Sequence, residues 1–179
     1  MIDKALMSSD RADWCTPPEI LEYVYKFFPG GVDLDPCSNS AALVDASVAM
    51  EGPPGKDGLT EPWSGNVFVN PPYGRNTMLA WARKMAAESA HCEILGLVPA
   101  RTDTRWCNVA MKSCTLICFV FGRIKFLDQS GAVQYPAPFP SAVFYWGKRP
   151  DHFRAVFCDL GSIWGPYEST QENHNVGEQ

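Results

Sequence analysis

The chain has 179 residues, of which 46% are hydrophobic and 20% are charged, with a formal net charge of −5. This composition is close to globular averages and excludes a disordered chain, a coiled coil and a fibrous repeat. The negative net charge argues against a polyanionic partner. The sequence shows no secretory signal and no apolar run of the ~20 residues that span a bilayer. We therefore expect one soluble domain over residues 1–164 and a flexible acidic tail over residues 165–179.

The first half of the chain contains turn residues between short periodic segments. Apolar residues recur at helical spacing over residues 17–28, where two prolines suit the first turn after an N-cap at Thr16. A short strand is expected over residues 32–36. Residues 40–50 are Ala-rich and predict a weak helix, and the Gly- and Pro-rich residues 51–65 predict a loop.

The second half is expected to continue as strand, helix, strand, helix and strand over residues 66–70, 76–90, 94–98, 103–112 and 116–121. Residues 122–126 are expected to continue into a hairpin arm. Two late strands are expected over residues 141–146 and 153–160. Strands that alternate with helices predict an α/β fold, with a mostly parallel sheet, helices on both faces and an antiparallel edge.

Charge is distributed unevenly along the chain. Residues 1–65 carry 4 basic and 11 acidic residues, whereas residues 66–164 carry 11 basic and 6 acidic ones. Residues 165–179 carry 3 acidic residues and no basic one. The middle segment could therefore contact phosphates, although ordinary solvated charges explain the same asymmetry.

Cysteine usage indicates a reducing compartment. The seven cysteines are odd in number and include no CxxC pair, and Cys114 and Cys118 lie in an apolar run without a neighbouring His. Buried reduced thiols explain this pattern better than disulfides do. We expect no metal site.

Polar residues follow the first and second predicted strands directly, where ligands bind in parallel sheets. Asn70-Pro71-Pro72-Tyr73 comes immediately after an apolar strand, and its prolines stiffen the loop and leave carbonyls without local donors. The Asn70 carboxamide oxygen and the Pro71 carbonyl could accept two hydrogen bonds from one planar amino group. The Tyr73 ring could stack on the heterocycle that bears it. The alternative is that Pro71-Pro72 only terminates the strand.

These four residues look like the catalytic motif of amino-group methyltransferases that use S-adenosylmethionine. Residues 13–20 resemble the first cofactor segment of adenine-N6 DNA methyltransferases. Further segments are similar to the phage-type DNA N6-adenine methyltransferases, namely residues 32–39, 57–59, Trp63, 70–73, 99–104, 122–126 and 140–142. The resemblance covers roughly residues 13–147 and implies a single domain with a Rossmann-like S-adenosylmethionine-dependent methyltransferase fold.

The resemblance implies that the acidic first segment binds S-adenosylmethionine. Thr16, Pro17 and Pro18 would border its methionine end, a role compatible with an N-cap at Thr16. The first loop lacks the glycines that most methyltransferases have, a feature that the phage-type family shares. The expected cofactor-binding residues are Trp14, Thr16, Pro17, Pro18, Asp35, Pro36, Cys37, Asn39, Asp57, Gly58, Leu59 and Asn70.

Acidic residues would hold the polar groups of this cofactor. Asp35 ends the first strand and could accept from the ammonium group, whereas Asp33 points to the opposite face and is expected to be structural. Asp57 could accept from the adenosyl amine, or it could simply form a turn before Gly58. Glu51 is a weaker candidate for the ribose hydroxyls.

The implied reaction is direct methyl transfer to N6 of a flipped-out adenine in double-stranded DNA. Asn70, Pro71, Pro72 and Tyr73 would be catalytic, with Tyr73 stacking on the base. Target recognition would fall to loops and to residues 99–140. The candidate DNA contacts are Arg75, Arg101, Arg105, Arg123 and Lys125.

Other acceptors and a non-catalytic role remain open alternatives. The same clamp is used on RNA adenine and on protein glutamine. It resembles less closely the clamp of cytosine-N4 methyltransferases, which more often have Ser in place of Asn70, and an idle nucleic-acid-binding module could keep the fold. The pattern outside residues 70–73 favours DNA adenine, and the intact clamp argues against an idle site. We expect a cytoplasmic protein of a bacterial or phage-infected cell, with no membrane partner; protection of phage DNA from restriction is a plausible role. The sequence leaves the oligomeric state open.

Overall fold

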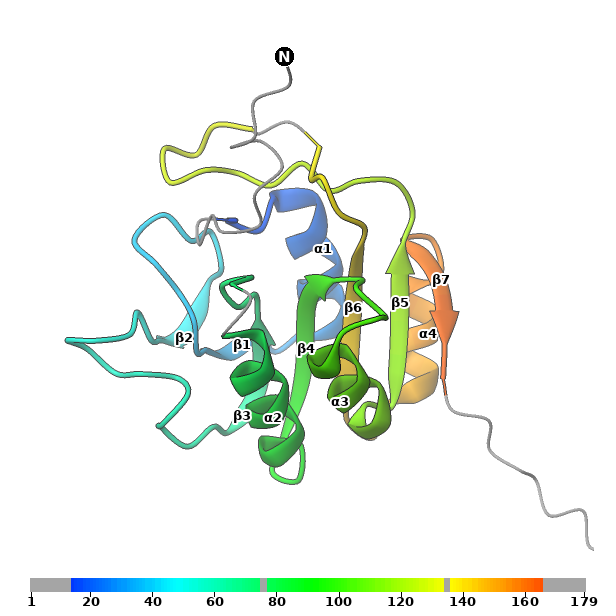
Figure 1. Ribbon diagram of the computed structural model, residues 1–179, viewed down its shortest axis with the longest axis horizontal. Helices are drawn as coiled ribbons and strands as arrows, with labels where there is room; N and C mark the ends of the chain where they lie inside the picture. The colour runs from blue at the N-terminus through cyan, green and yellow to red at the C-terminus, as the bar shows by residue number, and fades with distance from the viewer. Residues whose placement is uncertain (1–13, 75–76, 134–135, 166–179) are drawn as a thin grey trace, which may run out of the picture.

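The computed structural model describes residues 14–74, 77–133 and 136–165. Within them, four helices flank one seven-stranded sheet (Figure 1). The helices are α1 (Pro18–Phe27), α2 (Met78–Glu88), α3 (Arg105–Ser113) and α4 (Pro150–Phe157). The strands are β1 (Val32–Asp35), β2 (Ala46–Ala49), β3 (Gly65–Val69), β4 (Cys92–Pro99), β5 (Leu116–Val120), β6 (Ser141–Trp146) and β7 (Gly161–Trp164). None of these helices is long and apolar enough to cross a membrane.

The sheet is parallel in its first half and mixed in its second. Its strand order is β2-β1-β3-β4-β6-β5-β7. Strands β2, β1, β3 and β4 are mutually parallel, whereas β6 is antiparallel to both of its neighbours, β4 and β5. Strand β5 therefore runs in the same direction as β4, and both point upward in Figure 1. The carboxyl ends of β1, β3, β4 and β5 consequently share one edge of the sheet, called the carboxyl edge below.

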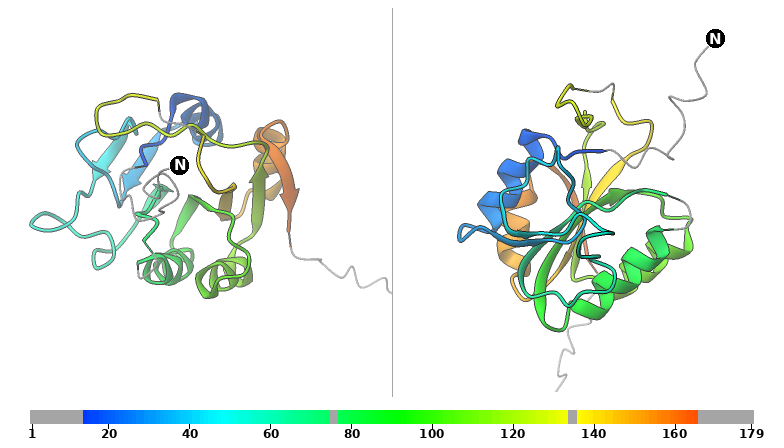
Figure 2. Two further views of the ribbon diagram at one scale, coloured as in Figure 1. Left: turned by 45° about the horizontal axis from the view of Figure 1, so that its top comes forward. Right: turned by 90° about the vertical axis from the view of Figure 1, so that its left-hand side faces the viewer.

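The helices cover both faces of the sheet, as expected. Helices α1 and α4 lie on one face, and α2 and α3 lie on the other (Figure 2, right). The Tyr145 ring of β6 meets Phe27 of α1 and Phe153 of α4, each at a centroid distance of 5.1 Å. On the other face, a Cβ atom at Gly96 would lie 2.9 Å from the Met85 sulfur, so a glycine lets α2 pack closely. All six residues of β6 are buried, which explains the unbroken apolar run from Ala142 to Trp146.

Two predicted elements are wrong. Residues 40–50 contain no helix; Ala46–Ala49 form the edge strand β2, paired parallel to β1. Ala favours a helix only when nothing competes, and the main-chain pairing with β1 outweighs that weak propensity. Residues 153–160 are not a strand, because α4 occupies Pro150–Phe157 and its two buried phenylalanines lie four positions apart on one face. Strand β7 follows α4 and was not predicted.

The segment after β5 also differs from the expectation. Residues 122–126 form no strand, and pairing occurs further on, where Leu127 bridges both Cys15 and Val133 in antiparallel fashion. The Cys15 and Leu127 amides each donate to the other residue's carbonyl at 3.0 Å. This segment runs over the carboxyl edge in Figure 1, and its pairing fixes residues 14–16 there.

Candidate functional site

A cavity of about 320 Å³ opens at the carboxyl edge, between the ends of β1 and β3 and the segment before α1. Its volume is in the usual range for small-molecule sites. It is lined by nine of the predicted cofactor-binding residues, namely Trp14, Thr16, Asp35, Pro36, Cys37, Asn39, Asp57, Gly58 and Asn70. Pro17, Pro18 and Leu59 do not line it. The weaker candidate, Glu51, does.

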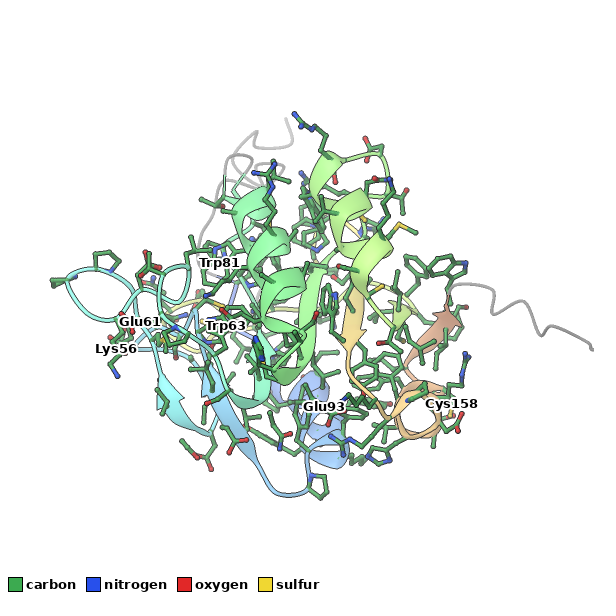
Figure 3. The ribbon with its side chains drawn as sticks, turned by 90° about the horizontal axis from the view of Figure 1, so that it is seen from below. Lys56, Glu61, Trp63, Trp81, Glu93 and Cys158 are labelled. Carbon is green, nitrogen blue, oxygen red and sulfur yellow. The ribbon has the colours of Figure 1, made fainter. Side chains whose placement is uncertain are left out.

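Sequence reasoning missed an apolar part of the wall. Val44 and Met50 flank strand β2 and line the cavity, as does Trp81 of α2. The first two were overlooked because residues 40–50 were interpreted as a helix. No pattern in the sequence separates Trp81 from an ordinary core residue, and the ring does pack in the core, 6.3 Å from Trp63 (Figure 3). Gln129 reaches the cavity from the segment after β5.

Asp35 is the buried acid of this cavity. Its residue is 4% exposed, and its Oδ1 accepts from the Cys37 amide at 3.2 Å. Burial raises the pKa of Asp35 to about 6, although hydrogen bonds from Cys37 and Ser38 oppose the shift. Among the described residues, no basic side chain forms an ion pair with it. The site therefore presents an acid whose charged form lacks a cationic partner.

Asp33 points the other way, as predicted. Its Oδ2 accepts from the Asn66 amide at 2.7 Å, which ties β1 to β3. Gly65 has a positive φ of 75°, and a Cβ atom there would lie 2.3 Å from the same carboxylate oxygen. Asp33 is thus a structural residue.

The Asp57-Gly58 loop approaches β1 closely. A Cβ atom at Gly58 would lie 1.9 Å from the Pro36 carbonyl oxygen, so only glycine fits this position. The Trp63 indole donates to the Gly58 carbonyl at 2.8 Å and holds the loop in place. Asp57 forms the turn that was its alternative predicted role, because its Oδ1 accepts from the Leu59 amide at 3.0 Å. Asp57 nevertheless lines the cavity, so the turn also presents its carboxylate there.

Asn70 joins this cavity to the Pro-Pro loop. Its Nδ2 donates to the Trp14 carbonyl at 2.6 Å and to the Thr16 hydroxyl at 3.0 Å. Its Oδ1 accepts from the Tyr73 hydroxyl at 2.6 Å. Thr16 is not the N-cap of α1, because Pro17 holds that position. The Thr16 hydroxyl is instead committed to Asn70.

Tyr73 lies in the core rather than on an open face. It is 2% exposed, and its ring meets Phe126 and Phe139 edge-on at centroid distances of 6.1 and 5.5 Å. Its hydroxyl also lies 3.2 Å from the Leu97 carbonyl. Burial holds the pKa of Tyr73 well above its usual value, so the hydroxyl keeps its proton. In this conformation the ring offers no free face for a flipped base.

The basic candidates lie along the carboxyl edge. Arg101 and Arg105 line a second cavity of about 670 Å³, which Tyr73 also borders. The Arg101 guanidinium lies 5.8 Å from the centre of the Phe139 ring. Arg123 and Lys125 are exposed on the segment after β5. The remaining candidate, Arg75, lies outside the described residues.

One family model matches most of the chain. A family model described as DNA N-6-adenine-methyltransferase (Dam) matches residues 4–150, a range that contains every predicted site residue. No curated protein matches the chain.

Proposed function

Since the chain belongs to the DNA N-6-adenine-methyltransferase (Dam) family, we propose that it transfers a methyl group from S-adenosylmethionine to N6 of adenine in double-stranded DNA. One observation carries this proposal: the Asn70 carboxamide and the buried Asp35 carboxylate border the same cavity. The mixed sheet is compatible with a methyltransferase-like fold, and we propose that residues 1–164 form one Rossmann-like domain of this kind.

The chemistry of the cavity wall fits S-adenosylmethionine. This cofactor supplies an electrophilic methyl group on a sulfonium. Asp35 is a buried acid without a cationic partner in the described chain, which suits an ammonium group. We assign Asp57 to the adenosyl amine and Glu51 to the ribose hydroxyls, because both carboxylates line the cavity on the loop side. The apolar wall at Val44 and Met50 suits the flat adenine ring.

Asn70 and Pro71 would act on the target amino group. Its nitrogen is a poor nucleophile because the lone pair is delocalised into the ring. Hydrogen bonds to the Asn70 Oδ1 and to the Pro71 carbonyl would favour a pyramidal nitrogen and stabilise its developing positive charge. Because these acceptors are held in place before the substrate arrives, little reorganisation is needed at the moment of reaction. Holding the nitrogen in line with the methyl group contributes further.

The Tyr73 hydroxyl donates to the Asn70 Oδ1, the atom that would accept from the target amino group. The incoming amino group would replace this hydrogen bond with its own. We therefore propose that the Tyr73 hydroxyl holds the Asn70 Oδ1 in place until the target amino group binds there. Stacking of Tyr73 on the base would require its ring to leave Phe126 and Phe139.

The DNA would approach along the carboxyl edge. The target base cannot reach Asn70 from within a duplex and would be flipped out, which costs a few kcal/mol. Arg101, Arg105, Arg123 and Lys125 would contact the DNA, and residues 99–140 would recognise the site. Binding through phosphates should weaken steeply with added salt, because association releases counterions.

A labelling experiment tests this proposal. The full chain is incubated with methyl-labelled S-adenosylmethionine and, in separate reactions, unmethylated duplex DNA, RNA and a protein mixture. We expect label only in DNA, and only in N6-methyladenine after digestion to nucleosides. Label in N4-methylcytosine, RNA or glutamine would redirect the assignment to another acceptor, and cofactor binding without transfer would indicate an idle module.

A further inference from the structure

We propose that the Trp14 carbonyl and the Thr16 hydroxyl position the Asn70 carboxamide for methyl transfer, which makes Thr16 a positioning residue. This inference rests on the proposed function. It concerns how the chain fixes the direction in which its catalytic amide points.

A carboxamide has one accepting end and one donating end, so its orientation decides whether it can receive an amino hydrogen. The terminal torsion of Asn is broad, and rotation by half a turn exchanges the two ends. With the donating end forward, the amide and the substrate amino group would both present hydrogens. Something in the protein must therefore exclude that orientation.

The Trp14 carbonyl excludes it. A carbonyl oxygen carries no hydrogen, so the atom 2.6 Å from it must be the Asn70 nitrogen. The Thr16 Oγ lies 3.0 Å from the same nitrogen and accepts its second hydrogen. Both amide hydrogens are thus bound on the side away from Tyr73, and Oδ1 is the end left to accept. Rotation would place two oxygens against each other at Trp14.

The segment that carries these two groups is itself fixed. Cys15 lies between them and pairs with Leu127 through two backbone hydrogen bonds of 3.0 Å. Thr16 is 3% exposed, and α1 begins two residues later. Because Pro17 rather than Thr16 is the N-cap of that helix, the Thr16 hydroxyl does not cap it. A short segment far from β3 in sequence therefore orients Asn70, the residue that directly follows β3.

Two substitutions at Thr16 separate positioning from cofactor contact. Thr16→Val keeps the shape and removes the hydroxyl, while Thr16→Ser restores it. We expect Thr16→Val to lower kcat about tenfold, as loss of one hydrogen bond in the transition state would. KM for S-adenosylmethionine and for DNA should stay within about twofold, and Thr16→Ser should recover most of kcat. An increase in KM for the cofactor alone, with kcat unchanged, would overturn the positioning role.

Thr115→Val is the matched control. The Thr115 hydroxyl donates to the Gly147 carbonyl at 3.0 Å, at the opposite edge of the sheet. Removing it should lower stability and leave kcat unchanged. A drop in kcat equal to that of Thr16→Val would show that lost stability alone explains both variants, and would contradict our inference.

A double-mutant cycle on unfolding tests the contact without any activity measurement. Denaturant midpoints are compared for Thr16→Val, Asn70→Ala, the double variant and wild type. We expect Thr16→Val to lower the midpoint less when Asn70 is already Ala, because the two side chains interact directly. Additive shifts would overturn the contact. If the cycle shows coupling but the wild-type protein methylates no DNA, the contact would be supported and the proposed function contradicted.

Discussion

Asp35 and Glu93 are carboxylates at opposite edges of one sheet, and their surroundings differ. Asp35 ends β1 in the cavity, where burial raises its pKa to about 6. Glu93 is the second residue of β4, at the other edge (Figure 3). Partial burial would raise its pKa too, but the Arg149 guanidinium and the Tyr145 hydroxyl outweigh burial and hold it below the usual value. Glu93 forms an ion pair with Arg149, whereas Asp35 forms none with the described residues.

The contrast extends to the groups around each acid. At the Glu93 edge, the Tyr145 hydroxyl donates to the carboxylate at 2.6 Å and accepts from the Arg149 amide at 2.8 Å, so it joins the two residues. The Arg149 guanidinium also lies 4.7 Å from the centre of the Phe27 ring, over α1. We infer that this edge serves stability and that the carboxyl edge serves ligand binding. Substitutions at the two edges should therefore have different consequences.

The largest effect is expected at Asn70. Asn70→Ala removes the amide acceptor and should lower kcat by about 100- to 1,000-fold, the range seen when one preorganised transition-state hydrogen bond is lost. Asn66→Ala is the matched control, since the Asn66 side chain donates to the Gly31 carbonyl at the other end of β3. Steady-state kinetics on duplex DNA should find that control near wild type. Equal losses in both variants would remove the distinction between the two edges.

Cofactor affinity should depend on Asp35. Asp35→Asn keeps the acceptor for the Cys37 amide and removes the negative charge. We expect calorimetry at pH 7.5 to show S-adenosylmethionine binding about 10- to 100-fold more weakly, as loss of one partner of a desolvated charge pair predicts. Wild-type affinity should also fall as the pH drops through about 6, because Asp35 becomes protonated. Affinity of the variant should not follow that pH dependence.

The same substitution should stabilise the protein without ligand. A raised pKa means that the folded state binds the proton more tightly, so this contribution to stability is present at low pH and lost as the pH rises through about 6. At pH 7.5 the ionised Asp35 lowers the free energy of unfolding by roughly 3 kcal/mol at most. Denaturant unfolding should therefore show Asp35→Asn as the more stable protein at pH 7.5, with the difference shrinking toward pH 5. A variant less stable than wild type at pH 7.5 would contradict this sign.

Glu93→Gln should have the opposite profile. It leaves the Arg149 guanidinium without its anionic partner, and we expect a loss of about 1–3 kcal/mol in the free energy of unfolding. Because the pKa of Glu93 is lowered, its contribution is present above the unfolded-state pKa and disappears as the pH falls through the folded-state value. Cofactor affinity should not change. Weaker binding of S-adenosylmethionine by Glu93→Gln would show that the two edges do not act independently and would contradict this prediction.

The smallest effect is expected at the exposed end of the carboxyl edge. Arg123→Ala and Lys125→Ala should each weaken DNA binding several-fold at physiological salt and lower the slope of log affinity against log salt by about 1. Fluorescence anisotropy over a range of salt concentrations measures this slope. Lys112→Ala is the control, because Lys112 lies in the last turn of α3, away from that edge. If the slope of log affinity against log salt is unaltered in both variants, Arg123 and Lys125 do not contact phosphates.

The sequence predicted the parts of the site that are local. Asp35 ends one short strand and Asn70 directly follows an apolar one, so strand patterning alone places both at the carboxyl edge. Gly58 followed from the resemblance, and its close approach to Pro36 shows why no other residue fits.

The remainder depends on packing between distant segments. Strand β2 is held by its pairing with β1 rather than by its own composition, and the enclosure of Tyr73 depends on Phe126 and Phe139. The contact between Thr16 and Asn70 joins residues 54 positions apart. No periodicity in the sequence encodes such a contact, which explains why Thr16 was interpreted as a cofactor contact and a helix cap instead.

The nucleoside content of DNA from living cells tests the central claim most directly. Plasmid DNA is recovered from a host without adenine methylation that expresses the full chain, digested to nucleosides and analysed by mass spectrometry. We expect N6-methyladenine in DNA from cells with the wild-type chain and about background levels with Asn70→Ala. Unmodified adenine in both samples, with wild-type chain present as folded protein that binds S-adenosylmethionine, would contradict the account.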